Sequence, residues 1–71
     1  MAISRHQKML VHFLLKHGLR DKDRILGISL LLKDSEWAME ELILFMEDNN
    51  PTEAQIMEKA IELHLQIQKK E

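Results

Sequence analysis

The chain has 71 residues, of which 45% are hydrophobic and 31% charged, with a formal net charge of −2 and no cysteine. A chain this short buries only about 60% of the surface that its unfolded form exposes, so one domain with a thin core is expected. The lack of cysteine excludes disulfides and thiol chemistry, and no apolar run reaches the roughly 20 residues of a membrane span, so we expect a cytoplasmic protein without a membrane segment.

Glycine and proline together account for three residues, which favours an all-helical chain. The first helix is expected over residues 4–17, with Ser4 as its N-cap and Gly18 in the left-handed position after its end. At 100° per residue, this helix has an apolar face and an opposite stripe of basic and histidine side chains. The stripe contains Arg5, Lys8, His12 and Lys16.

The second helix is expected over residues 22–33, after an N-cap at Asp21. Its large apolar side chains point in almost every direction, which is typical of a helix enclosed by its neighbours. Three short helices cannot enclose a fourth on all sides, so we expect a second copy of the chain to complete the wall, as in a homodimer. The residues expected at that contact are Leu26, Gly27, Leu30 and Leu31. The alternative is a monomer with an exposed apolar flank.

The third helix is expected over residues 35–47, with Asp34 or Ser35 as its N-cap. Two apolar residues seven positions apart point away from its main apolar face and lie among acidic side chains. Such a patch suits a basic protein partner, because tryptophan is a frequent binding hot spot. The residues expected to bind a partner are Trp37, Glu40, Glu41, Leu44 and Glu47. The alternative is that Trp37 folds against a neighbouring helix.

The fourth helix is expected over residues 53–68, after the turn signal DNNP at residues 48–51. Two capping boxes compete for its start: Thr52 with Gln55, or Asn50 with Glu53. A wide apolar face follows, and His64 lies in the middle of it. A hydrogen-bonded core or interface histidine is the expected role there, rather than a metal ligand or a base.

Charge is divided unevenly along the chain. Residues 1–33 contain seven basic and two acidic residues, whereas residues 34–71 contain ten acidic and three basic ones. Opposite halves attract each other, within one chain or between two. Binding of nucleic acid is not expected, because a helix-turn-helix reading would make the acidic third helix the recognition helix. If nucleic acid were contacted, the residues would be Arg5, Lys8, Lys16 and Arg20.

No spacing in the sequence indicates catalysis. His6 and His17 are about 16 Å apart along one helix, which is too far to share an ion. Carboxylate pairs four residues apart on exposed faces are typical of a solvated surface, and no phosphate loop or nucleophile motif is present. We therefore expect no enzyme, no cofactor and no metal.

These observations predict an all-α domain of four short helices, completed by dimerisation. The leading functional hypothesis is a non-catalytic regulatory or adaptor protein that binds another protein through the acidic surface around Trp37. Two alternatives stay open: a small DNA-associated regulator that uses the basic first helix, and a purely structural self-associating module.

Overall fold

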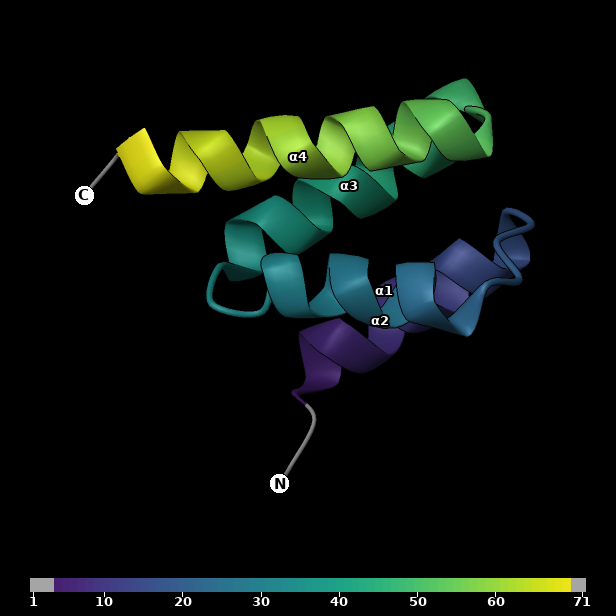
Figure 1. Ribbon diagram of the computed structural model, residues 1–71, viewed down its shortest axis with the longest axis horizontal. Helices are drawn as coiled ribbons and strands as arrows, with labels where there is room; N and C mark the ends of the chain where they lie inside the picture. Colours follow the sequence, from purple (N-terminus) through teal and green to yellow (C-terminus); the bar gives the residue numbers. More distant parts are fainter. Residues whose placement is uncertain (1–3, 70–71) are drawn as a thin grey trace.

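The computed structural model describes residues 4–69 and consists of four α-helices joined by short turns (Figure 1). The helices are α1 (Arg5–Lys16), α2 (Lys22–Leu31), α3 (Glu36–Asn49) and α4 (Glu53–Lys69). No strand occurs among the described residues, so the all-α four-helix fold is confirmed. The expected helix limits differ from the observed ones by at most two residues.

The helix starts follow local hydrogen bonds from cap residues. Ser4 forms a complete capping box: its hydroxyl accepts the Gln7 N–H at 3.1 Å, and the Gln7 side chain accepts the Ser4 N–H at 3.2 Å. At the start of α3, Ser35 and not Asp34 is the N-cap, and its hydroxyl accepts the Ala38 N–H at 3.1 Å. Each bond satisfies a backbone donor that the helix leaves without a partner.

The turn before α4 is also settled by side-chain hydrogen bonds. The Gln55 side chain accepts the Thr52 N–H at 2.9 Å, and the Thr52 hydroxyl accepts the Gln55 N–H at 3.3 Å. Asn50 instead ends α3 in the left-handed conformation, with φ of 46°. Of the two competing capping boxes, the structure therefore contains the one formed by Thr52 and Gln55.

The link between α1 and α2 ends in a buried residue. Gly18 has φ of +98°, and the N–H groups of Gly18 and Leu19 donate to the carbonyls of Leu15 (3.1 Å) and Leu14 (3.0 Å). This is the Schellman arrangement of a helix C-terminus, and the apolar pair that accompanies it is present because Leu14 and Leu19 are both fully buried. The turn thus contributes a leucine to the core.

The four helices share one core, and each packs on two others. α1 contacts α2 and α3, while α4 contacts α2 and α3, and Figure 1 shows α2 lying across α1 with α3 beside α4. Buried apolar side chains come from all four helices. The largest of them are Leu10, Leu14, Leu19, Ile28, Leu32, Met39, Leu42, Met46, Ile56 and Leu63.

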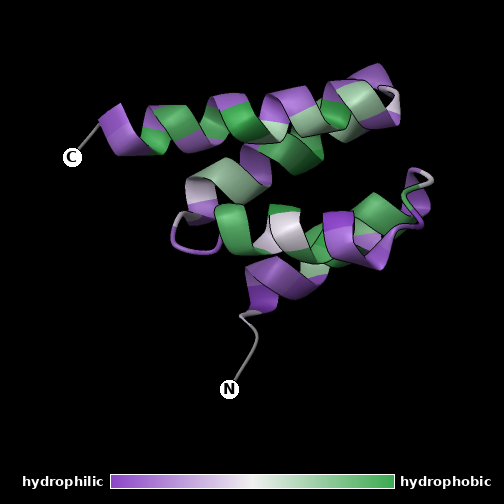
Figure 2. Cartoon of the chain, in the orientation of Figure 1, coloured by the Kyte–Doolittle hydropathy of each residue, from purple (hydrophilic) through white to green (hydrophobic). Residues whose placement is uncertain are grey.

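The second helix is covered on one side only. Its buried residues are Ile25, Ile28 and Ser29, and the Ser29 hydroxyl is satisfied by the Leu26 carbonyl at 2.9 Å. By contrast, Leu26 and Leu30 are 57% and 51% exposed, and Figure 2 shows how much of α2 is hydrophobic. The described part of one chain therefore does not enclose α2, as the excess of apolar side chains in its sequence predicts.

Gly27 and Gly18 should respond to alanine with opposite signs. A Cβ atom at Gly27 would have nothing within 4 Å, so Gly27→Ala is expected to stabilise the monomer by about 1 kcal/mol through helix propensity. Gly18→Ala is expected to destabilise it by about 1 kcal/mol, because φ of +98° disfavours a side chain. Urea unfolding at low protein concentration measures both effects, and a destabilised Gly27→Ala monomer would contradict this account of α2.

Candidate protein-binding surface

The two oppositely charged halves of the chain meet where α1 packs on α3. Lys16 Nζ donates to Glu47 Oε1 at 3.0 Å, and His17 Nε2 lies 3.7 Å from Glu47 Oε2. At the other end of α1, the His6 ring lies between two carboxylates, with distances of 3.4 Å to Glu36 and 3.5 Å to Glu40. The attraction between the two halves therefore operates within one chain.

Glu47 is the best-connected acid of this contact. The hydrogen bond from Lys16, reinforced by the positive charge of the same side chain, lowers the pKa of Glu47 below its ordinary value of 4.5. The carboxylate remains 36% exposed, so solvent screens the interaction. Beside it, His17 Nε2 is buried without a hydrogen bond, and the nearest carboxylate oxygen is that of Glu47.

Another pair of α3 side chains lies on the side of the helix opposite to its buried residues. Trp37 is 40% exposed and Leu44 is 55% exposed. They are seven residues apart, which places them on the same side of the helix and about 10 Å apart along it. Glu41 and Asp48 lie within about 60° of them around the helix axis. We call these four residues the α3 outer face.

The predicted partner-binding set is thus divided by the structure. Trp37, Glu41 and Leu44 belong to the α3 outer face, whereas Glu40 and Glu47 turn toward α1 and pair with its basic and histidine side chains. Asp48 was not in the predicted set, although its spacing of four from Leu44 is a usable signal for a shared helix side. Glu40 and Glu47 face α1 because of the way α1 crosses α3. The sequence pattern of α3 alone does not predict that crossing.

The predicted self-association residues are likewise divided. Leu26, Gly27 and Leu30 are exposed along one side of α2. Leu31 is half-buried and packs against the core.

The residues considered for nucleic acid lie mainly on exposed parts of α1 and of the following turn. Arg5, Lys8 and Arg20 are exposed. Lys16 is committed to Glu47 and also lies 5.3 Å from the centre of the Phe13 ring. Of the four basic residues predicted for a nucleic-acid contact, three are therefore exposed and the fourth is engaged within the chain.

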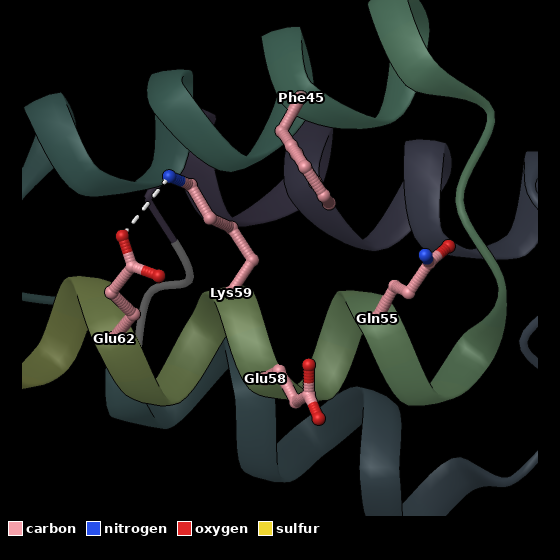
Figure 3. Close-up of a pocket in the computed structure, with 5 residues that line it drawn as sticks. All are labelled: Phe45, Gln55, Glu58, Lys59 and Glu62. Atoms are coloured by element: carbon pink, nitrogen blue, oxygen red, sulfur yellow. Dashed lines mark hydrogen bonds and ion pairs between the residues drawn. The ribbon is translucent and has the colours of Figure 1, made fainter.

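A depression between α3 and α4 is small and open. It is lined by Phe45, Gln55, Glu58, Lys59 and Glu62 (Figure 3). Lys59 Nζ lies 3.4 Å from Glu62 Oε1 and 5.6 Å from the centre of the Phe45 ring, so the cation is used in packing the two helices together. None of these lining residues is a buried base or nucleophile.

Histidines and acids do not gather into a ligand set. Among residues 4–69, no three His, Asp or Glu side chains are placed to hold one metal ion. His64 is half-buried, and its Nε2 lies 3.1 Å from the side-chain amide of Gln68, one turn later on the same helix. This contact gives His64 a local hydrogen-bond partner at the flank of the apolar face of α4.

Comparison of this chain with protein-family models, curated proteins and solved structures gives no match. Within the described residues, no helix is both long enough and apolar enough to cross a membrane. The argument for the α3 outer face as a binding surface therefore depends only on the geometry of its residues.

The contribution of Glu47 to stability should depend on pH in one direction. Because its pKa is lowered by folding, this contribution is fully present above the ordinary value of 4.5 and is lost as pH falls through the lowered pKa. Glu47→Gln should therefore reduce the urea midpoint near neutral pH and have steadily less effect in more acidic solution. Glu58→Gln, on the exposed side of α4, is the matched control. An effect of Glu47→Gln that does not change with pH would exclude this ion pair as its cause.

Proposed function

We propose that this protein is a non-catalytic regulatory or adaptor module that binds another protein through the α3 outer face. The observation that carries the proposal is the exposure of Trp37 and Leu44 on the side of α3 opposite to its buried residues. An exposed tryptophan with an apolar neighbour two turns away is an anchor of the kind that contributes most of the energy in protein interfaces.

The chemistry of this face indicates the kind of partner. Glu41 and Asp48 flank the two anchors, and neither carboxylate is in an ion pair with another described residue. Glu40 and Glu47 contribute less than the sequence suggests, because α1 already supplies their counter-charges. We therefore expect a partner helix or strand with apolar residues at its centre and a few lysines or arginines at its rim. Its affinity should fall only moderately with salt.

A second candidate function, self-association, is supported by a different observation. The exposed leucines of α2 lie on another helix from the α3 outer face, so these two apolar surfaces are separate. A homodimer formed through α2 would leave the α3 outer face uncovered. The two candidates are compatible with each other and are tested separately.

Trp37→Ala should weaken a partner complex more than tenfold, because truncation of a tryptophan hot spot typically costs about 2 kcal/mol or more. Affinity capture from native cell extract, quantified by mass spectrometry, should show specific partners that are retained by wild type and lost by this variant. Leu65→Ala, at a 51% exposed position on α4, is the matched control and should retain them.

Circular dichroism of Trp37→Ala separates binding from folding. The helical signal and the cooperative urea transition should be preserved, because the side chain is 40% exposed. Loss of the folded state would show that Trp37 serves the core instead. Equal capture by wild type and Trp37→Ala would exclude the α3 outer face as the binding surface.

A further inference from the structure

One exposed stripe on α2 has an acid at one end, a base at the other and two leucines between them. The spacings along it are three, four and three residues, which is the spacing of the apolar seam in paired helices. At 100° per residue, its members lie within about 80° of one another. The α2 stripe consists of Asp23, Leu26, Leu30 and Lys33.

The last residue of the stripe lies in the turn that directly follows α2, two residues after the helix ends. The N–H groups of Leu32 and Lys33 still donate to the carbonyls of Ile28 (3.2 Å) and Leu30 (3.4 Å). The backbone therefore continues for part of a turn beyond Leu31. Lys33 consequently lies at the far end of the stripe from Asp23, about 15 Å away along the axis.

The centre of the stripe is apolar and open to close approach. Leu26 and Leu30 are 57% and 51% exposed, and Gly27 beside them has no atom within 4 Å of the position a Cβ would take. A neighbouring helix could therefore pack against this side without displacing any described residue. Figure 2 shows this helix on an outer side of the molecule, hydrophilic in its first turn and largely hydrophobic beyond it.

The charges at the ends of the stripe indicate which partner it fits. Neither Asp23 nor Lys33 forms an ion pair with another residue in the described part of the chain. An antiparallel copy of the stripe presents its residues in the reverse order: base, leucine, leucine, acid. Each acid then faces a base, and each leucine faces a leucine. A parallel copy would place acid beside acid and base beside base, which is unfavourable. The stripe thus fits a second copy of this chain in antiparallel orientation.

We propose that two copies of the chain pair through α2 in an antiparallel arrangement about a two-fold axis that runs between the two helices, at the level of residue 28 along α2. Leu26 of one copy then packs on Leu30 of the other, at both symmetry-related positions. Asp23 of each copy faces Lys33 of its partner copy at the two ends. This register rests on the self-association proposed above and names the contacts that the sequence pattern alone left open.

Sedimentation equilibrium over a wide range of chain concentration tests the pairing. A single pair of short helices is a small interface, so the average mass should rise with concentration from 8.4 kDa toward twice that value. Leu30→Glu should abolish this rise, whereas Leu65→Glu, at an equally exposed leucine of α4, should leave it unchanged. Circular dichroism should show both variants folded.

Charge exchange tests the register itself. Asp23→Lys places lysine opposite lysine, and Lys33→Glu places glutamate opposite aspartate, so each single variant should lose the rise in mass. An equal mixture of the two variants should recover it, because every facing pair is then opposite in charge. The doubly exchanged chain, with Asp23→Lys and Lys33→Glu together, should also pair with itself.

Three kinds of result would overturn the proposal, and they are distinguishable. A wild-type mass of 8.4 kDa at every concentration would exclude self-association as well as the register. Two results would exclude the antiparallel register while retaining self-association. One is a dimer whose mass does not change on charge exchange, and the other is a mixture of the two single variants that does not recover the rise in mass. A dimer abolished by Trp37→Ala but not by Leu30→Glu would place the contact on the α3 outer face instead.

Discussion

The structure depends on how few neighbours a short helix can have in a chain of 71 residues. Each of the four helices packs on two others, so each can bury about one side in the common core. A helix whose apolar residues all lie on one side can bury them in this arrangement. Since α2 has apolar side chains around most of its circumference, the same arrangement leaves Leu26 and Leu30 in solvent, and both remain available for intermolecular packing.

A second constraint is the distribution of charge between α1 and α3. His6 lies against Glu36 and Glu40, and Lys16 against Glu47. Part of the acidity of the second half of the chain is therefore used inside the molecule. What remains on the outer side of α3 is a less acidic and more apolar surface than a count of residues suggests. Trp37 and Leu44 are the large apolar side chains exposed on this side of α3.

Features set by neighbouring residues could be predicted from the sequence, and features set by helix crossings could not. The capping box of Thr52 and Gln55 and the left-handed Gly18 depend on groups three or fewer residues away, so their patterns are legible along the chain. The excess of apolar side chains on α2 is also visible on a helical wheel. The inward turn of Leu31 and the pairing of Glu47 with Lys16 depend on which helix lies beside which, 31 residues away in the latter case.

The buried leucine in the turn after α1 has a consequence for the mechanics of the molecule. Leu19 is a loop residue by position, but its side chain is fully enclosed and its N–H is bonded back to Leu14. This connection is therefore anchored in the core, and it should hold α1 and α2 in a fixed orientation relative to each other. Protease cleavage, circular permutation or insertion of a tag at this turn would open the core, whereas such changes are better tolerated at loops whose side chains face water.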